Sequence, residues 1–265
     1  MRRTSRAELA ATLERLQLPR NHVYVVHSSL LKFGLFEDGL PGVTATLWHV
    51  LGADSTLLMP TFTFSFGRTR QWDCRASSAE TGALCEYFRR LPDTRRTLHP
   101  FHSLAVAGPQ AAAFAACEGL SSFGAGTPFA LLRDMAAFNI GLGTDFEGGA
   151  TFLHHGEEVA GVPYRSHLEF PGQVLDAQGR LLPQTFRMYV RHADANCRWE
   201  NRWAPVWDDL RREGLVRLER LHGAQVFALE VRPVHDWFVA RLKTDPLYCA
   251  RKLRVQATEQ EEQLT

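Results

Sequence analysis

The sequence lacks the marks of a membrane-spanning or disulfide-stapled protein. No apolar run approaches the 18 residues that a membrane helix needs, so we expect no membrane span. The basic N-terminus, MRRTSRAELAATLERLQLP, has no apolar stretch long enough for a signal peptide. The five cysteines are odd in number, and no two have the close spacing of a zinc knuckle. These absences indicate reduced thiols in a cytoplasmic protein.

An excess of charge is also missing. The net charge is only +1, which gives no electrostatic reason to expect nucleic acid or an anionic membrane as a partner. Hydrophobic residues make up 45% of the chain and charged residues 22%, the usual mix of a globular protein with its own core. We find no repeat, low-complexity linker or domain boundary, so we expect a single domain over residues 1–265.

Short buried strands alternate with helices in the first half of the chain. HVYVVHSSL (22–30) predicts a strand, residues 42–51 a helix, and residues 56–61 a second strand. Strand, helix and strand with short links form a βαβ unit, whose two strands pair in parallel. With further strands near 104–107 and in AAFNIGLGTD, the pattern predicts an α/β fold. We expect a mainly parallel central sheet sandwiched by helices.

The C-terminal part has a more irregular character. GQVLDAQGRLLPQTFRMYVRH predicts a hairpin that turns at Asp176–Gly179, and a helix, short strands and a second helix follow it. In open α/β sheets the functional site lies beyond the carboxyl ends of the strands. In this chain those ends carry His27-Ser28-Ser29 and Pro60-Thr61.

The stretch TFLHHGEE places two histidines beside two carboxylates. His154 and Glu157 are three positions apart, so they share a face of a helix. A carboxylate that holds one imidazole nitrogen raises the basicity of the other, as a histidine general base requires. The alternative is a solvated surface pair. His155 points about 100° away on the same helix, so we expect it to pack or lie on the surface.

Two other chemistries lack the motif that they need. A metal site could use His154 with Glu158, His167 and Glu169, but the HExxH spacing of zinc proteases is missing, and we expect no metal. A serine nucleophile at Ser28 or Ser29 lacks the Gly-x-Ser-x-Gly elbow.

Five motifs occur in an order that resembles the aminoglycoside 3-N-acetyltransferase family. They are VHSSLLKFG, GADSTLLMPTFTF, RRTLHPFHSLAVAGPQA, GAGTPFALL and TFLHHGEE, spread over about 140 residues. The resemblance implies an enzyme that moves an acetyl or other short acyl group from acyl-coenzyme A to a primary amine. It also implies that His154 is the base for the attacking amine and that Glu157 is its partner.

The same resemblance implies which residues bind acetyl-coenzyme A, the cosubstrate. They are Ser28, Ser29, Leu30, Arg96, His99, Ser103, Gly126 and Thr127. Thr127 stands where the family usually has serine, and it is predicted to cap the helix that begins at Pro128. Alternatively, Arg95 and Arg96 form a solvated pair, and His99-Pro100 is a structural turn. The resemblance leaves the choice between a monomer and a homodimer open.

The acceptor is a small-molecule amine, for which we expect contacts with Thr61, Asp145, Glu147 and Arg187. The segment after the catalytic motif holds Arg187, Arg191, His192 and Arg198, and Asp194 is its one acid. Because cations repel a polycationic antibiotic, we expect an amino sugar or similar biosynthetic metabolite as acceptor. Three alternatives remain open. The arginines could face solvent, the protein could be an aminoglycoside 3-N-acetyltransferase that confers antibiotic resistance, or it could be a non-catalytic coenzyme A-binding module.

Overall fold

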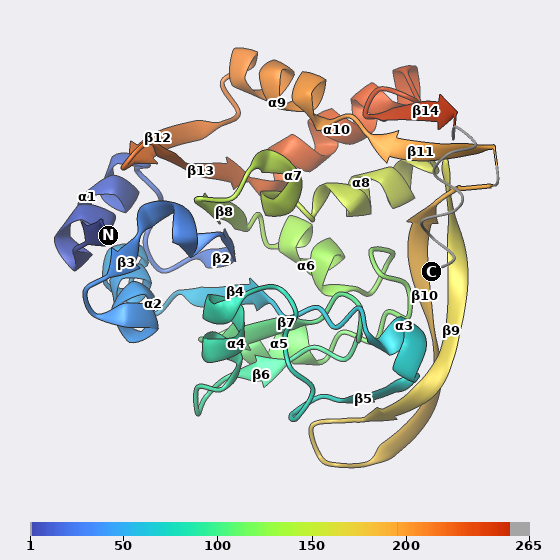
Figure 1. The fold of residues 1–265 in the computed structure, drawn as a ribbon, viewed down its shortest axis with the longest axis horizontal. Coiled ribbons are helices and arrows are strands. Elements are labelled where there is room, and N and C mark those ends of the chain that lie inside the picture. The colour runs from blue at the N-terminus through green and yellow to red at the C-terminus, as the bar shows by residue number, and fades with distance from the viewer. Residues whose placement is uncertain (1, 195, 255–265) are drawn as a thin grey trace.

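The computed structural model describes residues 2–194 and 196–254, and it combines helices with several sheets (Figure 1). The helices and one 3-10 helix are α1 (Arg6–Arg15), η1 (Leu30–Phe33), α2 (Gly39–Leu51), α3 (Phe66–Thr69), α4 (Ala83–Arg89), α5 (Ala111–Ala115), α6 (Pro128–Asp134), α7 (Phe146–Gly149), α8 (Leu153–Ala160), α9 (Trp203–Arg212) and α10 (Val231–Thr244). The strands are β1 (Arg3–Thr4), β2 (Val23–Ser28), β3 (Leu35–Phe36), β4 (Thr56–Pro60), β5 (Gln71–Asp73), β6 (Arg95–Arg96), β7 (Leu104–Ala107), β8 (Phe138–Leu142), β9 (Arg165–Leu175), β10 (Leu181–Arg191), β11 (Cys197–Asn201), β12 (Arg217–Leu221), β13 (Ala224–Glu230) and β14 (Ala250–Arg254). Among the described residues, no helix is long and apolar enough to cross a membrane.

The largest sheet has seven strands in the order β12-β13-β8-β2-β4-β7-β6. The predicted parallel pair is present, because β2 runs parallel to β4 and also to β8. The remaining pairs in this sheet are antiparallel. The fold is therefore mixed α/β, and the expectation of a mainly parallel sheet was wrong outside its centre. The direction of an outer strand depends on whether the preceding connection crosses the sheet, which local sequence patterns do not reveal.

The strands of this sheet contribute alternate side chains to two hydrophobic cores. Val23 and Val25 of β2 belong to one core, together with apolar residues of α6, α8, α9 and α10. Tyr24 and Val26 belong to the other, with residues of α1, α2 and α4. Successive side chains of a strand point to opposite faces, so burial on both faces explains why this strand is an unbroken apolar run.

A long hairpin of β9 and β10 forms a curved ribbon along one side of the molecule (Figure 1). The predicted turn is confirmed, since Gly179 N–H donates to the carbonyl of Asp176, and the Asp176 carboxylate accepts from the N–H groups of Gln178 and Arg180. The backbone of Arg187 bonds to Leu120 and Ser122, which ties this ribbon to the body of the protein. The polar stretch ATEQEEQL, from Ala257 on, has a composition that predicts a frayed end, and it lies outside the described residues.

Helix α8, which carries the His-His-Gly-Glu-Glu motif, packs closely on α10. A side chain at Gly156 would meet the Phe238 ring at 2.9 Å, so glycine permits this approach. Gly161 ends the helix in the left-handed region, with φ of 67°, and its N–H bonds to the carbonyls of Glu157 and Glu158. The motif is thereby held between the sheet and the C-terminal helix.

Gly141 of β8 should be intolerant of a methyl group. It lies opposite Phe227 of β13, whose ring occupies the space that a Cβ atom would take. We expect Gly141→Ala to lower the free energy of unfolding by about 1–3 kcal/mol through overpacking. Gly67→Ala is the matched control, because its Cβ would meet its nearest neighbour, Phe101, at an ordinary 3.5 Å. Urea denaturation of both variants measures the difference, and equal stabilities would contradict the packing assignment.

Candidate active site

The His154–Glu157 pair lies on one face of α8, as its spacing predicts. Nδ1 of His154 contacts Oε2 of Glu157. The Glu157 side chain has no exposed surface and that of His154 retains 19%. The alternative of a solvated surface pair is therefore wrong, and the imidazole is the member of the pair that reaches solvent.

Glu157 is surrounded by donors that keep it ionised. The hydroxyl of Tyr164 donates to Oε1 at 2.7 Å, and Nε of Arg165 lies 3.1 Å from Oε2. Cys249 Sγ approaches Oε1 at 3.7 Å. Burial alone raises the pKa of this carboxyl, but His154, Arg165 and Tyr164 outweigh it and bring the pKa to about 2. Glu157 is thus a buried anion throughout the physiological pH range.

His154 is kept neutral by its surroundings. Its ring lies between the rings of Phe123 and Trp203, with centroid distances of 5.1 and 5.6 Å. This burial lowers the pKa of His154 and Arg165 lowers it further, while Glu157 opposes both, and the net shift is downward. A neutral imidazole whose Nδ1–H donates to Glu157 carries its lone pair on Nε2, the state that a general base needs.

The other polar residues of the motif have structural partners. His155 is buried, its Nδ1 hydrogen-bonds to the carbonyl of Phe123, and its ring stacks on His235 at 4.8 Å, so the packing interpretation is confirmed. Glu158 accepts from Ser121 Oγ at 2.7 Å and pairs with His167 Nε2 at 3.1 Å. Within the part of the chain that the structure describes, no group of three or more His, Cys, Asp or Glu side chains could hold a metal.

The guanidinium of Arg96 is held by groups of the protein itself. It is buried, its Nε donates to Thr61 Oγ1 and Ser103 Oγ, and its terminal nitrogens donate to Thr63 Oγ1 and to the carbonyls of Thr61, Cys74 and Ser77. Thr61 and Ser103 are also fully buried and bond to each other. All three nitrogens of the guanidinium are therefore engaged within the protein. We assign these three residues, predicted to bind ligands, to a scaffold between β4, β6 and β7.

Some of the other residues predicted to bind the cosubstrate also have structural roles within the protein. Thr127 is confirmed as the N-cap of α6, since its hydroxyl accepts from Ala130 N–H, and Pro128 follows it. Gly126 adopts φ of 73° beside it. His99 is buried, and burial lowers its pKa to about 4. Ser28 ends β2, Ser29 follows it and Leu30 opens η1, and all three are partly exposed at the carboxyl end of this strand.

The acids predicted to hold the acceptor differ in their roles. Asp145 caps α7 by accepting from Gly148 N–H at 2.8 Å. Glu147 is exposed, and its Oε1 accepts from Asn201 Nδ2 at 3.0 Å. Asn201 Oδ1 in turn accepts from Arg165 Nη2 at 3.2 Å, so Glu147 connects to the His154–Glu157 pair through two residues.

The basic side chains of the hairpin and the strand after it are not equivalent. Arg187 is exposed, and its backbone makes the contacts that join it to the body of the protein. Arg191 is also exposed, yet its pKa is lowered by partial burial and by Arg165, and it senses the charges of Glu147 and Glu157. Arg198 pairs with Glu200 at 3.3 Å. Of these three arginines, Arg191 is the one whose charge couples to His154 and Glu157.

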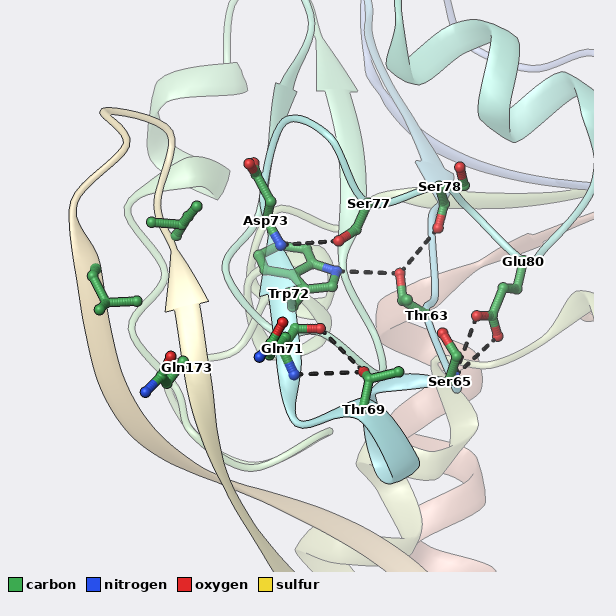
Figure 2. Close-up of a pocket in the computed structure, with 12 residues that line it drawn as sticks. Thr63, Ser65, Thr69, Gln71, Trp72, Asp73, Ser77, Ser78, Glu80 and Gln173 are labelled. Carbon is green, nitrogen blue, oxygen red and sulfur yellow. Dashed lines mark hydrogen bonds between the residues drawn. The ribbon is translucent and has the colours of Figure 1, made fainter.

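Two cavities lie at the hairpin side of the molecule. One, of about 530 Å³, lies between residues 63–80 and the hairpin, and Figure 2 shows Trp72 donating to Thr63 while Glu80 accepts from the backbone of Ser65. The other has about 760 Å³ and is bordered by a set of cations, Arg75, Arg89, Arg95, Arg96 and Arg180. Neither cavity is lined by His154.

Sequence reasoning missed the residues that lie around His154 and Glu157 in space but are remote from them in the chain. Arg165 opens β9 and Tyr164 precedes it, Trp203 opens α9, and Cys249 precedes β14. His102 is buried, bonds to Ser122 at 2.9 Å and packs on Phe123. The one sequence signal for these residues was the Tyr164-Arg165 dipeptide at the start of an extended segment. Its proximity to α8 depends on the fold.

The profile of the family described as aminoglycoside 3-N-acetyltransferase matches residues 25–243. Among curated proteins, the aminoglycoside N(3)-acetyltransferase IV of Salmonella sp is 31% identical over 160 residues, which is 60% of this chain and 60% of that protein. The match thus spans less than two thirds of this relative's length.

Solved structures agree with this similarity over nearly the whole chain. Aminoglycoside acetyltransferase AAC(3)-IVa, crystallised as a mutant in complex with a gentamicin, superposes with a TM-score of 0.78 and 26% identity, covering 94% of this chain and 92% of that one. AAC-IIIb in binary complex with CoASH has a TM-score of 0.77 and 22% identity, over 92% and 97% of the two chains, and shares the fold. This chain therefore belongs to the aminoglycoside 3-N-acetyltransferase family.

Proposed function

We propose that the protein is an acetyl-coenzyme A-dependent N-acetyltransferase that acts on an amine of an aminoglycoside. The observation that carries the proposal is the pair of a buried ionised Glu157 and a neutral, partly exposed His154. Family membership supports the reaction class. It favours the aminoglycoside alternative over the biosynthetic amino sugar that the hairpin arginines suggested, since the relatives above are named for aminoglycosides.

The argument from the arginines loses its force once their partners are known. Arg198 is balanced within its own strand, because Glu200 of β11 pairs with it and also with Arg251 of β14. Glu147 adds an exposed carboxylate that connects to the site through Asn201. The exposed Glu147 carboxylate suits an acceptor ammonium. Counting the charges of one segment therefore misjudged the electrostatic field of the whole site.

The base step follows from the geometry of His154. An ammonium is not a nucleophile, so Nε2 of His154 takes one proton and frees the nitrogen lone pair. The freed amine attacks the thioester carbonyl directly, the C–N bond forms, and the C–S bond breaks with its electron pair leaving on sulfur. The nitrogen loses its second proton as the amide forms, and the departing thiolate takes up one proton to leave as the coenzyme A thiol. Glu157 stabilises the imidazolium that forms, and no nucleophile of the protein is needed. We propose that donors near Ser28 and Ser29 stabilise the developing oxyanion.

Acetyl-coenzyme A supplies the activated acyl group, and its phosphates need cations or free N–H groups. Arg75, Arg89, Arg95 and Arg180 border the cavity of about 760 Å³, together with Glu118 and Asp176. Arg89 pairs with Glu86 and Arg180 with Asp176. Arg95 is exposed, whereas Arg96 is committed to the scaffold. We therefore transfer the predicted phosphate contact from Arg96 to Arg95. Leu30, Ser28 and Ser29 remain the proposed contacts for the pantetheine end.

His154 should be indispensable for turnover. We expect His154→Asn to lower kcat by about 10² to 10⁴, the usual contribution of a positioned acid or base. Coenzyme A affinity should stay close to that of the wild type, because the imidazole acts on the acceptor. His155→Asn is the control, since His155 packs beside His235 and hydrogen-bonds to the carbonyl of Phe123. Near wild-type kcat in folded His154→Asn would remove the mechanism.

Adjacent arginines should behave differently toward coenzyme A and toward denaturant. Arg95→Met should weaken coenzyme A binding in a salt-dependent manner and leave stability within about 0.5 kcal/mol, as for surface substitutions. Arg96→Met should lower the free energy of unfolding by about 1–3 kcal/mol, because buried acceptors lose their donor. Calorimetric titration and urea denaturation separate the two effects. Wild-type affinity of Arg95→Met at low salt would contradict the phosphate assignment.

The acceptor class can be decided by steady-state kinetics with acetyl-coenzyme A. Gentamicin-type and apramycin-type compounds should give a kcat/KM well above that of nucleotide-linked amino sugars, since the site rim supplies carboxylates for ammonium groups. The opposite order would favour the biosynthetic metabolite. Coenzyme A binding without thiol release for any amine would instead indicate a non-catalytic binding module.

A further inference from the structure

Arg165 is the one arginine in direct contact with the catalytic carboxylate among the described residues. Its Nε lies 3.1 Å from Glu157 Oε2, and only 7% of its side chain is exposed. Nη1 donates to the carbonyl of Tyr189 at 3.1 Å and Nη2 to Asn201 Oδ1 at 3.2 Å. The same Nη2 lies 3.4 Å from His154 Nδ1. These contacts from β9, β10 and β11 fix a positive charge beside both members of the pair.

A buried carboxylate needs a positive partner, and two candidates touch Glu157. If a protonated His154 filled this role, its Nε2 would carry a proton and could not accept one from an amine. If Arg165 fills it, the imidazole stays neutral and its Nε2 lone pair is free. The two states differ only in where the compensating charge lies.

We propose that Arg165 is a positioning residue that neutralises Glu157, so that His154 rests as an unprotonated base instead of as the carboxylate's counter-ion. The inference rests on the proposed function for the use of that base, but the charge assignment itself concerns the resting protein. It adds to the His-Glu pair a third member, which acts through Glu157 and His154 and needs no contact with substrate.

The cross-strand neighbour of Arg165 strengthens the inference. Arg165 of β9 pairs in register with Arg191 of β10, and like charges that face each other across strands are destabilising. Both arginines oppose protonation of His154, whereas Glu157 favours it. His102 also senses the charges of His154 and Arg165, and it is itself held neutral by burial. Burial lowers the pKa of His154 most, and the two arginines add to it against Glu157, so the net shift favours the unprotonated imidazole.

The test is a titration of His154 by imidazole ¹⁵N NMR in the free protein, with its signal assigned through His154→Asn. We expect Arg165→Met to raise the pKa of His154 by at least about one unit, the usual effect of a charge within a few ångströms. Arg165→Lys keeps the charge and should retain the wild-type pKa. Arg191→Met should give a smaller rise because Arg191 is exposed. Arg15→Met, which breaks the Arg15–Glu219 pair, is the matched control and should give no shift.

The pH profile of kcat/KM should shift in proportion to the pKa of His154 in each variant, most in Arg165→Met and less in Arg191→Met. Raising the pKa of His154 removes the free base at low pH, so the acid limb of Arg165→Met should move to higher pH and activity should recover in alkali. A merely structural role would lower activity equally at all pH values in both Arg165→Met and Arg165→Lys. An unchanged His154 pKa in folded Arg165→Met would overturn the inference, and Arg165→Gln provides the same test if the methionine variant does not fold. Because the NMR titration needs no acceptor, its result stands even if the acetyltransferase activity fails.

Discussion

A carboxylate without solvent contact is costly to bury, and the active site is organised around the one at Glu157. Its cost is offset by a phenol, a guanidinium and an imidazole that come from α8 and from the start of β9. Removing a single partner from such a cluster leaves a buried charge uncompensated. This lowers the stability of the fold more than replacing the whole pair with apolar residues would. The need to surround one anion therefore fixes how α8, β9 and β11 sit against each other.

This constraint also explains why the long hairpin belongs to the site. Its root places Arg165 and Arg191 beside the catalytic pair, while its turn at Asp176–Gly179 lies next to the cavity lined by arginines. One ribbon thus contributes to both the base and the hollow that we propose for the phosphates (Figure 1). Tyr189 and Phe186 are buried against the body of the protein, which keeps the ribbon from moving independently.

What the sequence could predict was local. The spacing of His154 and Glu157, the Thr127 cap and the turn at Asp176 depend on nearby residues, and the structure confirms all three. Strand directions in the outer sheet and the partners of Glu157 depend on contacts across long stretches of chain. Arg96 illustrates the limit, because an arginine in a ligand-binding motif gives no sign that its nitrogens are all used internally. The acceptor argument counted the charges of one segment, and it left out Glu200, which pairs with Arg198, and Glu147, which Asn201 connects to Arg165.

The central claim is that His154 rests neutral, with its proton on the nitrogen that faces Glu157. Neutron diffraction from deuterated crystals near pH 7 measures this directly, because it locates the exchangeable protons that the mechanism depends on. The account predicts one deuteron on Nδ1 of His154, none on Nε2 and none on the Glu157 carboxylate. Deuterons on both ring nitrogens, or one on Glu157, would contradict it.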